Sequence, residues 1–189
     1  MPTRWWPVKS MVAGKRVAVI GRAASIHGSG HGPEIDSADV VVRVNWVLPL
    51  DPEHAPDVGT RTDLVYHCWR NCNAAKTAAI ARKVRTQRID GPLRRDLAIQ
   101  AGKDPDVYRP NTGTVAIFDV LKHGAQHVTV YGMDLFRSGH TEGQPLFVPD
   151  PRRKRSSWHH DPSVDVRLIA EITKQGRVSV SPELAKVLG

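Results

Sequence analysis

Residues 16–45 read RVAVIGRAASIHGSGHGPEIDSADVVVRVN, and this stretch decides the fold. An apolar run at Val17–Ile20 predicts a buried strand, and Val40–Val44 predicts a second strand that ends on the polar Asn45. The segment between them is rich in glycine, at Gly21, Gly28, Gly30 and Gly32. Glycines after a buried strand let main-chain N–H groups approach an anionic ligand at the carboxyl edge of an α/β sheet. By pattern alone, the stretch predicts a nucleotide or phosphate site.

The rest of the chain alternates strands with helices. Further strands are expected at Leu64–His67, Val128–Tyr131 and Val178–Val180, and helices at Asn73–Arg85, Leu93–Ala101, Thr112–His123, Val164–Lys174 and after Ser181. This order predicts an α/β fold with a mostly parallel, Rossmann-like sheet flanked by helices. At 189 residues we expect a single domain, 1–189, in which the long basic loop 133–160 acts as a lid.

The order of residues in the opening stretch, followed by DVGTRTD at Asp57–Asp63, resembles the large sialylmotif of glycosyltransferase family 29, the eukaryotic-type sialyltransferases. The resemblance implies a sialyltransferase-like variant of the GT-A fold and a nucleotide-sugar donor. It implies donor contacts from the glycine loop and the end of the second strand, at Gly21, Arg22, Ser25, Gly28, Ser29, Gly30 and Asn45. Arg22 departs from the family, which usually has Asn there, although a guanidinium can bind a phosphate through two hydrogen bonds.

A second stretch, Arg109–Met133, resembles the small sialylmotif, in which a Pro-Ser/Asn-Thr-Gly turn begins a helix and a strand ends in Tyr-Gly. Asn111 and Thr112 can cap the helix, and Gly113 leaves room at its positive end for a carboxylate or phosphate. Taken alone, these residues are also explained by an ordinary helix N-cap. The resemblance implies that all three contact the donor's ribose and the sugar carboxylate.

Two histidines match working positions of the family. His140 lies in RSGHTEG, shortly after the Tyr-Gly strand, and His160 begins HDPSVD, a His-x4-Glu motif with Asp165 in place of Glu. The adjacent His159 is an alternative in register. A histidine just before a helix N-terminus stays neutral and available as a base. The resemblance therefore implies that His160 removes the acceptor proton and that His140 stabilises the leaving phosphate, with Asp165 in support.

The implied reaction is an inverting transfer of sialic acid from a CMP donor to an acceptor hydroxyl. It uses no metal and no cofactor, since the nucleotide sugar is a co-substrate. The partners are then the donor and a glycan or other hydroxyl acceptor. Asp104-Pro105-Asp106 has the form of the Asp-x-Asp of metal-dependent glycosyltransferases, but it falls between expected elements, where a turn explains it better.

The net charge of +8 favours an anionic partner, with basic runs at Arg82–Arg95 and Arg152–Arg155. One alternative is a transferase that uses another nucleotide sugar or a nucleic-acid acceptor. Another is a non-catalytic nucleic-acid-binding module, whose basic runs grip phosphates while its five tryptophans stack on bases. The sequence does not indicate an oligomeric state.

Several features favour a cytoplasmic enzyme. No apolar run is long enough to cross a bilayer, and MPTRWWPVKSM at the start is too polar for a signal peptide. Cys68 and Cys72 form a C-x3-C pair, a weak metal or redox signature. The family's disulfide between the two sialylmotifs aligns with Val17 and Ala125, as expected in a reducing compartment.

Overall fold

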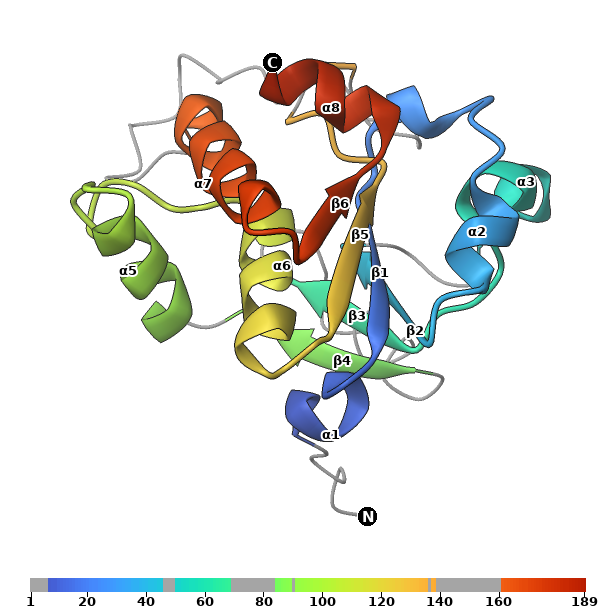
Figure 1. Cartoon of the computed structure of the whole chain (residues 1–189), viewed down its shortest axis with the longest axis horizontal. Helices are drawn as coiled ribbons and strands as arrows, with labels where there is room; N and C mark the ends of the chain where they lie inside the picture. Colours follow the sequence, from blue (N-terminus) through green and yellow to red (C-terminus); the bar gives the residue numbers. More distant parts are fainter. Residues whose placement is uncertain (1–6, 46–49, 69–83, 90, 136, 139–160) are drawn as a thin grey trace.

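The computed structural model describes residues 7–45, 50–68, 84–89, 91–135, 137–138 and 161–189. Their strands form one six-stranded sheet in the order β4-β3-β2-β1-β5-β6, and every neighbouring pair is parallel. The strands are β1 (Arg16–Ile20), β2 (Val40–Val44), β3 (Leu64–His67), β4 (Arg85–Arg88), β5 (His127–Tyr131) and β6 (Val178–Val180). The predicted parallel α/β architecture is confirmed (Figure 1).

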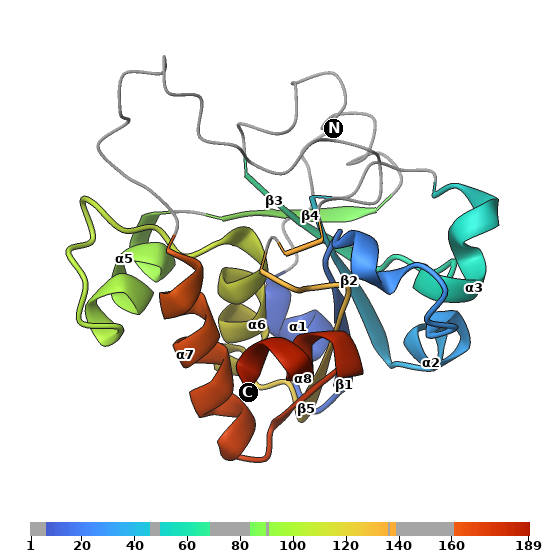
Figure 2. The same ribbon diagram turned by 90° about the horizontal axis from the view of Figure 1, so that it is seen from above.

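Helices lie on both sides of this sheet, with α5, α6 and α7 on one side and α2 and α3 on the other (Figures 1 and 2). The helices are α1 (Val8–Val12), α2 (Gly32–Asp36), α3 (Ala55–Val58), α5 (Gly91–Gln100), α6 (Thr112–Lys122), α7 (Pro162–Lys174) and α8 (Pro182–Leu188), with 3-10 turns η1 (Ala24–Ile26) and η2 (Pro52–His54). The strand-helix order therefore builds three layers, as a doubly wound sheet requires.

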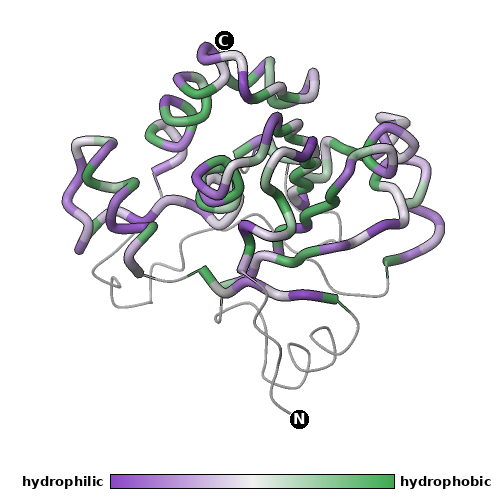
Figure 3. Tube along the Cα trace, turned by 60° about the horizontal axis from the view of Figure 1, so that its bottom comes forward, coloured by the Kyte–Doolittle hydropathy of each residue, from purple (hydrophilic) through white to green (hydrophobic). Residues whose placement is uncertain are grey.

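The central strands β1, β2 and β3 are buried on both faces, which explains their continuous apolar runs. Val17 and Val19 of β1 join the large core cluster that includes α6, α7 and α8. Ala18 and Ile20, the alternate residues of the same strand, pack in a second cluster with α2 and α3. Because successive side chains of a strand point to opposite faces, a strand between two helical layers needs apolar residues throughout. Hydrophobic stretches accordingly gather in the interior of the molecule (Figure 3).

Two elements differ from the sequence prediction. The helix expected at Asn73–Arg85 lies outside the described residues up to position 83, and its last residue, Arg85, instead begins β4. This strand, RTQR, pairs with β3 at one edge of the sheet, so it can be polar and carries no apolar run to reveal it. Helix α5 begins at Gly91, two residues before the expected Leu93. Of the expected lid 133–160, positions 139–160 lie outside the described residues.

Candidate active site

The carboxyl ends of the central strands bring the two sialylmotif stretches to one edge of the sheet. Gly21 follows β1, Asn45 follows β2 and Gly132 follows β5, and α6 begins at the same edge with Thr112. This edge is where open parallel sheets place their ligands. Gly21 and Gly132, which are 111 positions apart in the chain, thus become neighbours at the edge where the sequence predicted the site.

The glycine loop, however, binds a carboxylate of the protein itself. The main-chain N–H of Gly28 donates to Oδ2 of Asp57 at 2.8 Å, and that of Gly30 donates to Oδ1 at 2.9 Å. Both glycines have left-handed φ angles, +75° and +69°, which a side chain would disfavour. The bonds from Gly30 and Gly28 lower the pKa of Asp57. The expectation that these two N–H groups bind a donor phosphate is therefore corrected, because Asp57 occupies them.

Gly21 and Gly113 allow close packing around Met133. The N–H of Gly21 donates to the carbonyl of Tyr131 at 2.9 Å, so it serves the sheet and not a ligand. A Cβ at Gly21 would overlap the carbonyl oxygen of Gly132 and the side chain of Met133, and a Cβ at Gly113 would overlap the end of the same methionine. The space expected at Gly113 for a ligand is thus filled by a buried thioether.

Arg22 and Asn45 connect the ends of three strands. Nη1 of Arg22 donates to the carbonyl oxygen of Asn45 at 3.1 Å. Asn45 has a left-handed φ of +59°, and its Oδ1 accepts the N–H of Cys68 at 3.1 Å. The side-chain oxygen of Asn45 is therefore engaged within the protein, and its amide N–H groups remain the part that suits a ligand acceptor.

The two predicted serines differ in their surroundings. Ser25 donates its main-chain N–H to Oγ of Ser138 at 2.9 Å, while its own buried hydroxyl has no hydrogen-bond partner in the described part of the chain. Ser29 uses its hydroxyl to accept the N–H of His31 at 3.4 Å, a weak local bond. The Ser25 hydroxyl is thus unsatisfied in the described structure, whereas the Ser29 hydroxyl accepts one weak bond and keeps its proton to donate.

The small-motif turn is joined to α7 by a buried carboxylate. Asn111 caps α6, since its Oδ1 accepts the N–H of Thr114 at 2.9 Å, which confirms the predicted N-cap. The main-chain N–H of Asn111 donates to Oδ1 of Asp165 at 3.1 Å, and the Asp165 residue is fully buried. Burial raises the pKa of Asp165 to about 6, although the Thr114 hydroxyl and the Asn111 N–H favour its charged form. Asp165 therefore links the third motif to the second.

Both predicted catalytic histidines, His140 and His160, lie outside the described residues. The start of α7 is described, and there Asp161 accepts the N–H of Ser163 at 3.1 Å with Pro162 at the first helical position. This is the predicted cap, so His160 directly precedes a helix N-cap in the chain.

A replacement of Asp165 by asparagine should stabilise the protein at neutral and higher pH. The pKa of Asp165 is about 6 in the folded state and 3.8 in the unfolded state, so the folded state binds the carboxyl proton more tightly. The stabilisation that this proton provides is complete below about pH 4 and is lost as the pH rises through about 6. Asn keeps an oxygen for the N–H of Asn111 and carries no charge. We expect the free energy of unfolding of Asp165→Asn to exceed that of the wild type by about 3 kcal/mol at pH 8 and by about a third of that at pH 4.5.

Urea denaturation at the two pH values measures the difference. Asp161→Asn is the control, since the hydrogen bond from the Ser163 hydroxyl lowers the pKa of Asp161 and reverses the expected sign. An Asp165→Asn protein that is less stable than the wild type at pH 8 would show that the fold needs the negative charge.

The sequence patterns did not predict that Arg43 binds the DVGTRTD segment of the large motif. Arg43 lies in the middle of β2 and is fully buried. Its Nη2 donates to the carbonyl oxygens of Val58 at 2.7 Å and Arg61 at 2.8 Å, and its Nε donates to Oγ1 of Thr62 at 2.9 Å. Burial lowers the pKa of Arg43 to about 10. The signal in the sequence was a charged residue within the apolar strand VVVRV, which requires buried partners.

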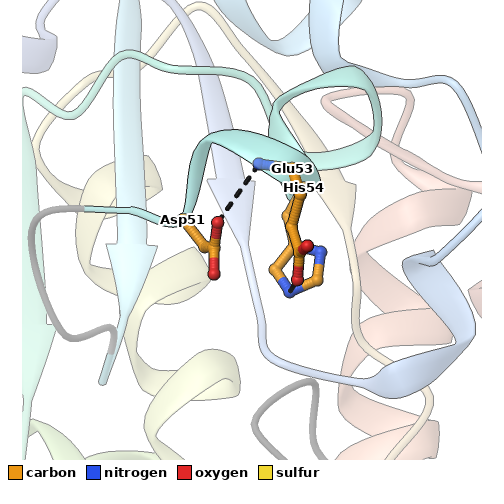
Figure 4. A group of neighbouring side chains, drawn as sticks. All are labelled: Asp51, Glu53 and His54. Carbon is orange, nitrogen blue, oxygen red and sulfur yellow. Dashed lines mark hydrogen bonds and ion pairs between the residues drawn. The ribbon is translucent and has the colours of Figure 1, made fainter.

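Two acidic groups could suggest a metal. Asp104 accepts the N–H of Asp106 at 2.8 Å, so Asp104-Pro105-Asp106 is the expected turn. Asp51, Glu53 and His54 can bring one ligand atom each within 4.8 Å of one another (Figure 4). Here Asp51 caps η2 by accepting the N–H of Glu53, and both acids are exposed, so an ordinary turn explains the group.

Within the described ranges, no helix is both long and apolar enough to span a bilayer.

Comparisons with known proteins give the site its context. Residues 7–90 match the model of glycosyltransferase family 29 (sialyltransferase). An alpha-N-acetylneuraminide alpha-2,8-sialyltransferase of Xenopus tropicalis is 47% identical over 51 residues, which are 27% of this chain and 14% of that protein. A CMP-N-acetylneuraminate-beta-galactosamide-alpha-2,3-sialyltransferase 1 of Mus musculus is 43% identical over 60 residues, which are 31% of this chain and 17% of that protein. The chain thus matches only a small part of the length of these relatives.

Solved structures extend the likeness of the fold beyond residue 90. A crystal structure of a mammalian sialyltransferase in complex with Gal-beta-1-3GalNAc-ortho-nitrophenol superposes with a TM-score of 0.64 and 18% sequence identity, covering 96% of this chain and 75% of that one. A second crystal structure of a mammalian sialyltransferase gives a TM-score of 0.65 at 17% identity, covering 96% and 74%. The match over residues 7–90 shows that this part of the chain is similar to glycosyltransferase family 29, and nearly the whole chain shares its fold with solved sialyltransferases.

Proposed function

We propose that this protein is a sialyltransferase-like glycosyltransferase that transfers a sugar to an acceptor hydroxyl. The resemblance to family 29 implies that the sugar is sialic acid and that the donor is its CMP derivative. The observation that carries the proposal is the hydrogen bond from the Asn111 N–H to the buried Asp165. It joins the small-motif turn to the helix that follows His160, at the sheet edge where β1 and β2 of the large-motif stretch also end. In this proposal the three motif stretches serve one site.

In this proposal the donor lies along the carboxyl edge of β1, β2 and β3. After the corrections above, the groups suited to it are Arg22, the Ser25 hydroxyl, the amide of Asn45 and the side chain of Thr112 at the start of α6. The N–H groups of Gly28 and Gly30 instead shape the loop through Asp57. The glycines thus support the site without touching the phosphate.

The proposed chemistry is an inverting displacement. The nucleotide phosphate departs, the sugar centre becomes oxocarbenium-like, and the acceptor hydroxyl attacks from the opposite face. His160 takes the proton of that hydroxyl, a role for a base with a pKa near neutrality. His140 and the arginines of segment 137–155 neutralise the leaving phosphate electrostatically, so no divalent ion is needed.

The wider context is proposed on the same basis. We propose that residues 1–189 form one domain that works in the cytoplasm, with a glycan as the acceptor. A different nucleotide sugar, or a nucleic acid as acceptor, fits the basic charge of the chain. The similarity to sialyltransferases does not favour a purely nucleic-acid-binding module.

A nucleotide screen by thermal unfolding tests the donor. CMP is expected to raise the melting temperature more than UDP, GDP or ADP, since a ligand that binds only the folded state stabilises it. Addition of EDTA should leave the CMP effect unchanged. Transfer from CMP-sialic acid to lactose or to Gal-GalNAc, followed by mass spectrometry, then tests the reaction. Strong stabilisation by UDP or ADP with no effect of CMP would refute sialyl transfer and leave glycosyl transfer with another donor.

A further inference from the structure

Arg94 reaches the start of the small-motif helix from a neighbouring helix. It lies on α5, which packs beside α6 (Figures 1 and 2). Its Nη2 donates to Oγ1 of Thr112, the first residue of α6, at a long 3.4 Å. Thr112 is itself buried. A guanidinium is thus placed at the positive end of an 11-residue helix.

The charge of Arg94 has no ion-pair partner among the described residues. Its Nε is buried and makes no hydrogen bond within that part of the chain. Burial lowers the pKa of Arg94, Arg109 lowers it further, and Cys68 and Asp165 oppose the change. The one carboxylate among these groups, on Asp165, accepts the N–H of Asn111, and no ion pair between Asp165 and Arg94 is present in the described structure. The next residue, Arg95, differs, since it pairs with Asp106 at 3.3 Å on the surface.

A second polar group near this position is also unsatisfied. Asn111 is only 6% exposed, and its Nδ2 has no hydrogen-bond partner among the described residues. The amide lies beside Asp165, although not in hydrogen-bonding geometry. A buried donor with no acceptor, and a partly buried cation with no ion pair among the described residues, cost stability, and a bound ligand can complete both. Two such groups at a helix N-terminus favour an oxyanion.

We infer that Arg94 is a specificity-determining residue that binds an oxyanion of the donor, the sugar carboxylate or the nucleotide phosphate, at the N-terminus of α6. The inference rests on the proposed function and deepens it, because it names a residue that would recognise the acidic group of the donor at the N-terminus of α6. Both oxyanions match the fork of a guanidinium, which can donate two parallel hydrogen bonds. Arg94 was not among the residues that the motifs pointed to.

Calorimetric binding to three probes tests the inference. The probes are CMP, a fluorinated and unreactive CMP-sialic acid, and neutral cytidine. Arg94→Gln is expected to weaken binding of the fluorinated donor by about tenfold or more, the usual effect of losing a charged hydrogen bond. Cytidine binding should not change. An equal loss with CMP identifies the phosphate as the bound group, whereas a loss confined to the fluorinated donor identifies the carboxylate.

The control is Arg95→Gln, one position along the same helix, which should bind every probe within about twofold of the wild type. The melting temperature of Arg94→Gln should not fall, because the substitution removes a buried charge that has no ion pair in the described structure. If that variant does not fold, Arg94→Lys keeps the charge, loses the fork and should still bind the donor several-fold more weakly. Wild-type affinity in the Arg94 variants would overturn the inference alone. Failure of the wild type to bind either CMP probe would overturn the proposed function with it.

Discussion

The His160→Ala protein is expected to lose about two to four orders of magnitude in turnover, the usual share of general-base catalysis. CMP affinity should stay nearly unchanged, because the base acts on the acceptor hydroxyl and not on the nucleotide. In the chain His160 directly precedes Asp161, the N-cap of α7, and the positive end of a helix disfavours a charged imidazole. Turnover and CMP binding, measured on the same preparations, separate the two effects.

Two further variants sharpen this prediction. His159→Ala, at the adjacent position, should keep most of the activity and serves as the control. His140→Ala should lose turnover and bind the nucleotide more weakly, since its proposed partner is the phosphate. A fully active His160→Ala enzyme would remove the assignment and make His159 the first alternative. Full activity of both the His140 and His160 variants would remove the proposed mechanism.

The Arg43→Met substitution is expected to lower the free energy of unfolding by about 3–5 kcal/mol, the range found when one partner of a buried charged network is removed. Methionine fills a similar length, but the carbonyl oxygens of Val58 and Arg61 and the hydroxyl of Thr62 lose their donors. These acceptors lie in the segment that carries the DVGTRTD element, so we expect that segment to loosen as well. Urea denaturation gives the free energy.

Arg16→Met provides a matched comparison on the adjacent strand. Arg16 pairs with Asp39 at 3.4 Å, and its side chain is 61% exposed. An exposed ion pair contributes about 0–1 kcal/mol, so this variant should be almost as stable as the wild type. Equal stability of the two methionine variants would mean that the buried guanidinium of Arg43 contributes no more than a surface one.

Local sequence was sufficient for most of the fold. The apolar runs of β1, β2, β3 and β5 are buried on both faces, and such runs by themselves predict central parallel strands. Asn111 and Asp161 predicted the starts of α6 and α7, because a helix cap is a hydrogen bond between a side chain and a main-chain N–H two or three positions away. The exception is β4, whose polar RTQR is held at the sheet edge by its pairing with β3. A pairing between distant segments leaves no trace in such a short polar run.

Local patterns and motif order were enough to predict the resemblance to glycosyltransferase family 29, the parallel α/β sheet and the edge of that sheet where the carboxyl ends of β1, β2 and β5 meet. Which polar groups at that edge are already occupied follows only from the folded structure. Asp57 binds Gly28 and Gly30 from 29 and 27 positions away, and Met133, just after the end of β5, fills the space beside Gly113 of α6. Arg94 reaches Thr112 from 18 positions away and remains without an ion-pair partner in the described structure. Hydrogen-bond satisfaction depends on three-dimensional proximity, and residue types alone do not specify it.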